Sequence, residues 1–107
     1  MKCIWTKRAL NEYQRIVGYI FNEFGKKAAL TFVDDIELWD SRIAENPEIG
    51  AIEPLLAERK RYKYHSFIVS KHNKLIYTIS KDRSVTIADI WDMRRHPDNL
   101  AKRIKTK

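Results

Sequence analysis

The spacing of apolar residues changes once along this 107-residue chain, and this change constrains the fold more than any other feature. Between residues 8 and 45, apolar side chains recur every three or four positions, which is the period of an amphipathic helix. From residue 61 they gather in short runs rich in Tyr, Phe, Ile, Val and Thr, which are typical of strands. Helices followed by strands predict an α+β fold, in which an N-terminal antiparallel helical hairpin packs on a small twisted antiparallel β-sheet.

Two helices are predicted in the first half, over residues 8–24 and 26–45. Gly25 is a natural C-cap between them, and Pro47 ends the second helix because the residue before a proline avoids the α region. The connection is so short that the helices must run antiparallel. Gly18 lies inside the first helix and costs about 1 kcal/mol relative to Ala. Close packing against the second helix would account for it.

Three strands are predicted in the second half, over residues 61–70, 74–80 and 84–91. The separators at 71–73 and 81–83 are polar and compatible with turns, so the strands form an antiparallel meander.

Shorter features lie at the two ends of the chain and in the core. We expect an edge strand at Ile4–Trp5, and we expect Tyr77 and Trp91 to lie in the core. Pro97 with Asp98 begins either a short last helix or a basic tail. The cations of that tail are Lys102, Arg103, Lys105 and Lys107.

Length and composition predict one globular domain spanning residues 1–107. Hydrophobic residues make up 44% of the chain and aromatic residues 11%, which argues against disorder. Cys3 is the single cysteine, so a disulfide framework and a cysteine-based zinc site are excluded, and a reducing compartment fits. No apolar run approaches the roughly 20 residues of a membrane helix, and residues 1–8 lack the features of a secretory signal. We therefore expect a cytoplasmic protein that does not contact a membrane.

Charge is concentrated in the second half of the chain. Residues 1–53 carry seven Lys/Arg and nine Asp/Glu, whereas residues 54–107 carry fourteen Lys/Arg and five Asp/Glu. A half with a net charge of −2 thus precedes one of +9. Such a cationic half attracts anions, of which nucleic acid is the commonest large one in a cell. A solvated surface, or a face that pairs with an acidic protein, is the alternative.

Residues 59–74 hold six cations and no acid, interleaved with aromatic residues. Cations bind phosphates and aromatic rings stack on bases, so the pattern indicates binding of nucleic acid or another target. The alternative is a strand with aromatic residues in the core and cations in solvent. The candidate binding residues are Lys60, Arg61, Lys63, Tyr64, Lys71, Lys74, Arg94 and Arg95.

A second cationic group, Arg94-Arg95-His96, follows the last predicted strand. If the meander brings it beside Arg61 and His65, several cations and a histidine converge. Arginines stabilise the charge that develops on a phosphate, and a histidine can accept the proton of a 2′-hydroxyl. Arg61, His65 and Arg94 are therefore the candidate catalytic residues if the protein cleaves RNA without a metal.

No cofactor and no metal site are expected. The three glycines stand too far apart for a dinucleotide-binding or phosphate-binding loop. The three histidines lack the spacing of metal ligands, and no motif supports a serine-based triad.

Over nearly its whole length, the chain resembles the RelE/ParE toxins of type II toxin–antitoxin modules. The resemblance rests on Ala9 to Gly25, Ala28-Ala29 with Phe32, Ala44 to Gly50, Arg61-Tyr62, Leu75 to Tyr77 and Asp89 to Pro97. It implies the same fold as above and a toxin of the plasmid-stabilisation type. It also implies a cognate antitoxin that wraps the toxin. Such antitoxin segments are often acidic and amphipathic, and the cationic half would suit them.

The family has two branches with different targets. The RelE-like branch cleaves mRNA in the decoding site of the ribosome with Lys, Arg, Tyr or His on the sheet, and the ParE-like branch poisons DNA gyrase. The long hairpin, Tyr19 to Gly25 and Glu45 to Gly50 resemble the ParE-like branch. The sequence departs from the RelE-like branch because no Tyr follows Arg94-Arg95.

The resemblance therefore implies gyrase poisoning first and cleavage of ribosome-bound mRNA second. In the second case the protein would be a metal-independent endoribonuclease. A non-toxic RNA-binding or protein-interaction module is the third alternative.

Overall fold

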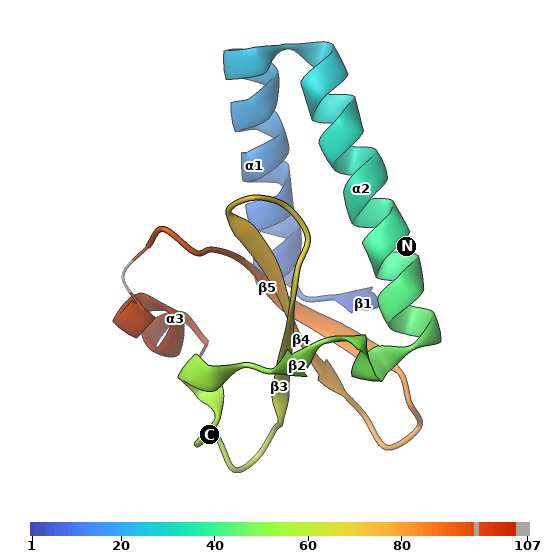
Figure 1. The fold of residues 1–107 in the computed structure, drawn as a ribbon, viewed down its shortest axis with the longest axis vertical. Helices are drawn as coiled ribbons and strands as arrows, with labels where there is room; N and C mark the ends of the chain where they lie inside the picture. The colour runs from blue at the N-terminus through green and yellow to red at the C-terminus, as the bar shows by residue number, and fades with distance from the viewer. Residues whose placement is uncertain (96, 105–107) are drawn as a thin grey trace.

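The structure is a computed structural model that describes residues 1–95 and 97–104. Figure 1 shows two long helices rising as a hairpin from a sheet, with a short helix beyond the end of the last strand. The elements in chain order are β1 (Ile4–Trp5), α1 (Lys7–Phe24), α2 (Lys26–Glu45), the 3-10 turn η1 (Pro47–Ile49), β2 (Ala51–Ile52), the 3-10 turn η2 (Pro54–Leu56), β3 (Tyr64–Ile68), β4 (Asn73–Ile79), β5 (Val85–Asp92) and α3 (Pro97–Arg103).

The helical hairpin forms as predicted. The side chain of Thr6 accepts a hydrogen bond from the backbone N–H of Ala9 and caps the start of α1. Gly25 has a φ of 93°, which residues with a Cβ rarely adopt, so this one residue ends α1 and starts α2. The backbone N–H of Asn46 donates to Arg42 O at the end of α2, directly before Pro47.

The sheet has five strands in the order β1-β5-β4-β3-β2. The predicted meander is present, since β3, β4 and β5 pair antiparallel. The predicted α+β fold is confirmed, but the sheet as a whole is mixed and not antiparallel, because β1 pairs parallel with β5. The meander leaves the outer edge of β5 open, and β1 occupies it before the chain turns into α1. A bulge at Ile76/Tyr77 bends the β4–β5 pair, which curves the sheet.

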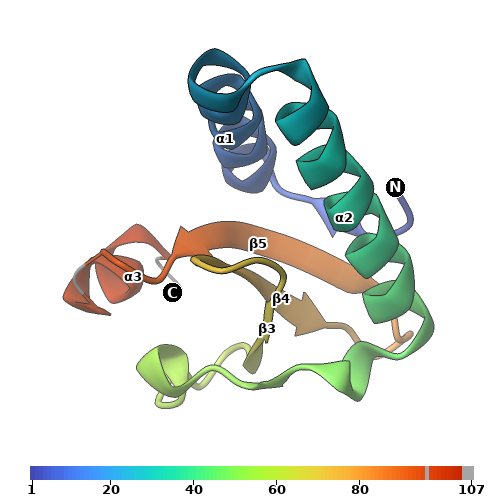
Figure 2. The same ribbon diagram turned by 45° about the horizontal axis from the view of Figure 1, so that its top comes forward.

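The two faces of the sheet carry two separate cores. Figures 1 and 2 show the hairpin on one side of the sheet and α3 beyond the end of β5. Tyr77 and Trp91 are 0% and 1% exposed, so their predicted place in the core is confirmed. The core under the hairpin includes Ile16, Phe32, Ile36, Ile43, Leu75, Tyr77, Ile87 and Ile90. The core under α3 consists of Leu56, Tyr64, Ile76, Trp91, Leu100 and Ile104.

Gly18 differs from the sequence-based expectation. A Cβ added at this residue would meet no heavy atom within 4 Å, and the residue is exposed. Close packing between α1 and α2 therefore does not account for it.

The long helices do not resemble membrane spans. Among the described residues, no helix combines the length and the apolar character needed to cross a bilayer.

Candidate functional site

Three of the predicted binding residues lie on the loop between η2 and β3. Lys60, Arg61 and Lys63 are all exposed there, and the Arg61 guanidinium lies 5.4 Å from the centre of the Tyr62 ring. Arg59 Nη2 donates to the backbone oxygen of Ala101 at 2.7 Å, which fastens this loop to α3. The loop thus presents cations and an exposed aromatic ring to solvent.

Tyr64 and His65 follow on β3 and point to opposite faces of the sheet. Tyr64 is 5% exposed in the core under α3, so its ring is covered. His65 pairs across the strands with Tyr77, and the two rings stack with centroids 5.4 Å apart. His65 Nδ1 also lies 3.2 Å from Gly50 O. The histidine is thus packed into the hairpin side of the sheet.

The hydroxyl of Tyr77 holds the segment 47–50, between α2 and β2, close to the sheet. Its hydroxyl donates to Pro47 O at 2.6 Å and accepts from the N–H of Gly50 at 2.9 Å. A Cβ on Gly50 would lie 2.5 Å from that hydroxyl and 2.6 Å from Ser66 O. Glycine is therefore required here for close approach.

Lys71 and Lys74, the two remaining lysines among residues 59–74, differ in their exposure to solvent. Lys71 is exposed in the turn between β3 and β4. The side chain of Lys74 is 14% exposed and forms an ion pair with Glu53, whose side chain is 0% exposed. The charge of Lys74 is thus neutralised within the chain. Sequence reasoning missed Glu53, because its distance from Lys74 in the sequence hides the contact.

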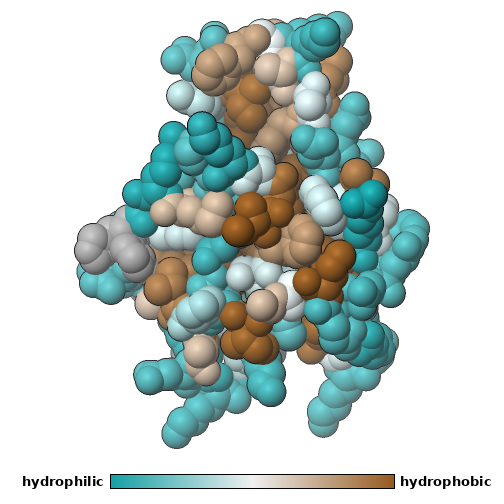
Figure 3. All heavy atoms as spheres, in the orientation of Figure 1, coloured by the Kyte–Doolittle hydropathy of each residue, from teal (hydrophilic) through white to brown (hydrophobic). Residues whose placement is uncertain are grey.

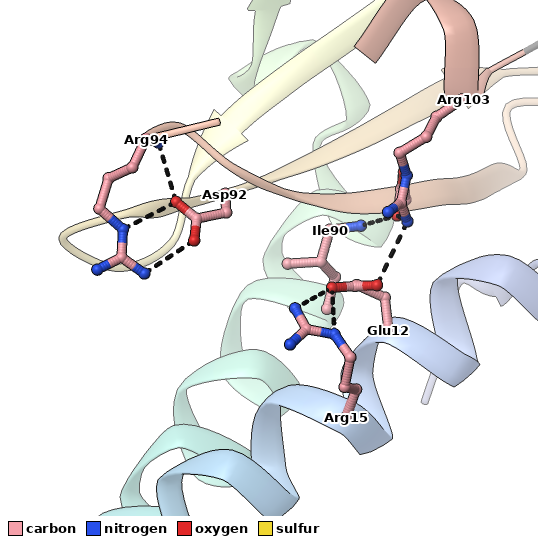
Figure 4. A network of polar contacts seen from close by, with 7 residues as sticks. Glu12, Arg15, Ile90, Asp92, Arg94 and Arg103 are labelled. Carbon is pink, nitrogen blue, oxygen red and sulfur yellow. Dashed lines mark hydrogen bonds and ion pairs between the residues drawn. The ribbon is translucent and has the colours of Figure 1, made fainter. Parts of the chain in front are cut away.

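Arg94 and Arg95 follow β5, and both have partners, of which Figure 4 shows that of Arg94. Arg94 Nε and Nη2 donate to the two oxygens of Asp92 at 3.0 and 2.8 Å. This fork lowers the pKa of Asp92 to about 2. The Arg95 guanidinium lies 5.1 Å from the centre of the Trp91 ring. His96, the third member of this predicted group, lies outside the described residues.

Arg61 and His65 of the first cationic group lie toward one end of β4, whereas Lys71 and Lys74 lie at the other end, where Arg94 follows β5. Tyr64 pairs with Thr78 at one end of this strand, and Asp92 pairs with Asn73 at the other. Thr78 and Asn73 are five residues apart along β4, which corresponds to about 17 Å in an antiparallel strand. The structure therefore does not bring Arg94 beside Arg61 and His65. The three side chains were expected to meet, but this requires Arg61, His65 and Arg94 at the same end of the meander.

A groove lies between α1 and the end of β5. Its volume is about 490 Å³, and Ile16, Ile20 and Phe24 of α1 form its apolar side. Figure 3 shows hydrophobic surface between the hairpin and the strands, framed by hydrophilic residues. The polar side of the groove consists of Arg15, His72, Asn73, Asp92 and Arg94. The groove therefore has one apolar side and one polar side, and its arginines already have carboxylate partners, Arg15 in Glu12 and Arg94 in Asp92.

A charged network beside the groove joins α1, β5 and α3 (Figure 4). Arg103 Nε and Nη2 donate to both oxygens of Asp89 at 2.8 and 2.9 Å, and Nη2 lies 3.4 Å from Glu12 Oε2. Burial raises the pKa of Asp89, and the bonds from Arg103 act against this rise.

Glu12 is the link to α1 in this network. Burial opposes the ionisation of Glu12, but Arg15 and Arg103 together lower its pKa. The arrangement consists of carboxylates and guanidinium groups. In the part of the chain that the structure describes, no three His, Cys, Asp or Glu side chains are placed to hold a metal ion.

The fold defines a class of small α+β protein: a long helical hairpin over a curved sheet, here with exposed cations on the loop before β3. Within that class the chain belongs to the ParE toxin family of type II toxin–antitoxin systems (parDE), whose family model matches residues 3–97. The resemblance noted from the sequence is thus confirmed.

At least two solved structures share this fold. One is from a chromosomal ParDE toxin–antitoxin system of P. aeruginosa, with 17% identity and a TM-score of 0.66 over 86% of this chain and 95% of that one. The other is a YoeB dimer from Staphylococcus aureus, with 19% identity and a TM-score of 0.52 over 83% of this chain and 92% of that one. Among curated proteins, no sequence matches.

Proposed function

We propose that this protein inhibits growth by poisoning DNA gyrase, unless it is bound by its cognate antitoxin. Membership of the ParE toxin family supports a toxin with an antitoxin partner. One observation favours gyrase over mRNA as the target. The candidate nuclease residues are divided between opposite ends of β4, with Arg61 and His65 near one end and Arg94 at the other.

Metal-independent cleavage of RNA needs a base and cations around a single phosphate, at hydrogen-bond distance from the reacting atoms. Here the ring of His65 is stacked on Tyr77, and Arg94 is engaged by Asp92. Both side chains would have to leave these contacts before they could act together on one phosphate.

The second candidate function is cleavage of ribosome-bound mRNA. It is favoured by the exposed Lys60, Arg61 and Lys63, which stand beside the exposed ring of Tyr62 and suit an RNA backbone. In that case the protein would be a metal-independent endoribonuclease.

Both targets are found in the cytoplasm, so we place the protein there and treat residues 1–107 as one domain. A role in plasmid stabilisation would follow if the gene pair is carried on a plasmid. Neither candidate function needs a small-molecule cofactor.

The proposal is tested by inducing the protein alone in bacteria and following DNA and protein synthesis by pulse labelling. We expect DNA synthesis to fall first, and we expect purified protein to produce gyrase-linked breaks in plasmid DNA. Co-expression of the antitoxin is the control and should abolish both effects.

An early fall in protein synthesis, with DNA synthesis continuing, would instead support the mRNA nuclease. The combined variant R61A/H65A/R94A should then lose RNA cleavage. Unchanged growth, with neither synthesis affected, would support a non-toxic binding module.

A further inference from the structure

Ion pairs within the chain leave one group of cations without a partner. Arg94, Arg103 and Lys74 are each held by a carboxylate elsewhere in the fold. Five exposed cations around the small core under α3 form no ion pair among the described residues, and we call them the cationic rim: Lys60, Arg61, Lys63, Arg95 and Lys102. Their charge is therefore available to an anion outside the chain.

Two arginines of this rim lie on aromatic rings. The Arg61 guanidinium lies 5.4 Å from the centre of the Tyr62 ring, and the Arg95 guanidinium lies 5.1 Å from the centre of the Trp91 ring. Such a contact holds a guanidinium through its flat face and leaves its N–H groups free to donate. Each of these arginines can therefore bind one phosphate through two N–H groups with little further loss of side-chain entropy.

The two rings belong to one face of the sheet. Tyr62 packs edge-on against Tyr64, with ring centroids 6.3 Å apart, and Tyr64 and Trp91 lie in the same core. Figures 1 and 2 show α3 close to η2, the turn that precedes the loop with Arg61. The stacked arginines thus lie on the α3 side of the sheet, away from the hairpin.

The spacing of the two arginines fits a nucleic-acid backbone and not a single phosphate. Tyr64 is paired with Thr78 of β4, and Trp91 is paired with Lys74. Thr78 and Lys74 are four residues apart, which corresponds to about 14 Å. Each strand of a DNA duplex carries one phosphate per about 3.4 Å of axis, so this separation covers about four phosphates. A separation that prevents joint action on one phosphate is thus suited to two contacts along one backbone.

The aromatic rings of this surface favour a duplex over a single strand. Single-stranded nucleic acid is bound by stacking its bases on exposed aromatic rings. Trp91 is 1% exposed and cannot receive a base, and the Tyr62 ring, 44% exposed, already carries Arg61. A duplex keeps its bases stacked on one another and presents its phosphates, and contacts to phosphates carry no sequence information. The rim therefore suits double-stranded DNA of any sequence.

We propose that the cationic rim binds the phosphate backbone of double-stranded DNA, with Arg61 and Arg95 each donating to a phosphate. In the cell this DNA is the segment held by gyrase, so the toxin contacts the DNA as well as the enzyme. That last step rests on the proposed function, whereas binding of the rim to a duplex does not.

The rim is tested by fluorescence anisotropy of a labelled DNA duplex, titrated with the purified protein at several salt concentrations. We expect Arg95→Gln and Arg61→Gln each to weaken binding and to lower the slope of log affinity against log salt by about 1, the value for one phosphate contact. Arg42→Gln is the matched control, because Arg42 is also exposed and lies 4.8 Å from the centre of a tryptophan ring, that of Trp39. Trp39 packs against Phe67 in the core under the hairpin, so this change should leave affinity and slope unchanged.

Two results of this titration would overturn the proposal. One is a wild-type protein that does not bind the duplex, and the other is equal weakening by Arg95→Gln and Arg42→Gln. Single-stranded RNA of the same length is the second probe. Tighter binding to this RNA than to the duplex would also contradict the proposal.

A separate assay of gyrase-linked breaks in plasmid DNA distinguishes this proposal from the proposed function. We expect R61Q/R95Q to produce fewer breaks than the wild type, and R42Q to produce as many. Undiminished breaks with R61Q/R95Q would show that the rim does not contact gyrase-held DNA, while the gyrase target stands. No breaks with the wild type, together with rim-dependent binding of the duplex, would refute the gyrase target alone.

Discussion

Arg94 is a candidate binding and catalytic residue from the sequence, and in the structure it is paired with Asp92. Three hydrogen bonds join Arg94 to Asp92, two from its guanidinium and one from its backbone N–H at 2.9 Å. The pair closes the turn after β5 beside the groove. A partner that binds Arg94 must therefore displace Asp92 from it, and a partner that binds Asp92 must displace Arg94.

The strength of this pair is measurable as a pKa. The ionised form of Asp92 is stabilised in the folded protein, so its pKa falls from 3.8 to about 2. Because the pKa is lowered on folding, the contribution of Asp92 to stability is complete above pH 3.8 and is lost as the pH falls through about 2. We expect Arg94→Ala to return the pKa of Asp92 toward 3.8, as measured by NMR titration of the carboxyl carbon.

Asp82 is the internal control for this titration. Its pKa is also lowered to about 2, but by hydrogen bonds from Ser80 and Ser84 in the β4–β5 turn. Arg94→Ala should leave it unchanged. If both carboxyl groups shift together, or if Asp92 does not shift at all, the Arg94 fork is not what holds the pKa of Asp92 down.

At the scale of elements, Arg103 is the residue through which α3 reaches carboxylates on β5 and α1. Arg103 reaches Asp89, which is fully buried on β5, and Glu12 on α1. Its guanidinium also lies 5.9 Å from the centre of the Trp91 ring. The first long helix of the chain and its last two elements thus meet at a single guanidinium group.

Asp89→Asn keeps the size of the side chain but removes the charge-assisted fork to Arg103. We expect the free energy of unfolding to fall by about 1.5–3 kcal/mol, the usual value of hydrogen bonds to a charged group. Urea denaturation measures this loss, and hydrogen exchange should show faster exchange of the α3 amides. Asp92→Asn is the matched comparison, because Arg94 is 63% exposed and solvent screens its pair with Asp92, so the loss should be smaller than for Asp89→Asn. Equal losses in the two variants would contradict this role of Asp89.

The elements with a strong local pattern were predictable from the sequence. The helical period and Gly25 placed α1 and α2 to within a residue or so, and the β-branched and aromatic runs placed β3, β4 and β5. The two-residue strands β1 and β2 depend on pairing with distant strands. The Ile4–Trp5 edge strand was expected from apolar character alone, and β2 was missed because Ala51–Ile52 has no strand-like run around it.

The candidate site was less predictable than the fold, for a physical reason. The composition identifies the cationic residues. Whether a cation is available to a binding partner depends on the ion pairs that it forms within the folded chain. Lys74 with Glu53 and Arg103 with Asp89 are contacts between residues distant in the sequence. The relative placement of Arg61 and Arg94 depends on strand register, which alternation within one strand does not determine.

At the scale of the whole molecule, the positive charge is unevenly placed. The hairpin half is close to neutral, whereas residues 54–107 carry the net charge of +9. The exposed members of that half include Lys60 and Lys63 on the loop before β3 and Lys71 on the turn before β4. An acidic partner approaching from a distance is therefore attracted to the sheet end of the molecule and not to the hairpin tip.

This asymmetry predicts how a cognate antitoxin associates with this protein. The association rate constant should fall steeply as salt is raised, because the screening length shrinks from about 10 Å at 0.1 M to about 3 Å at 1 M. The variant K60A/K63A should lower that rate constant and flatten its salt dependence, with little change in the dissociation rate constant. Stopped-flow mixing measures both. The variant K26A/K27A removes the same charge from the exposed hairpin tip and serves as the control. If it slows association as much as K60A/K63A does, net charge alone steers the partner, and the placement of the cations is irrelevant.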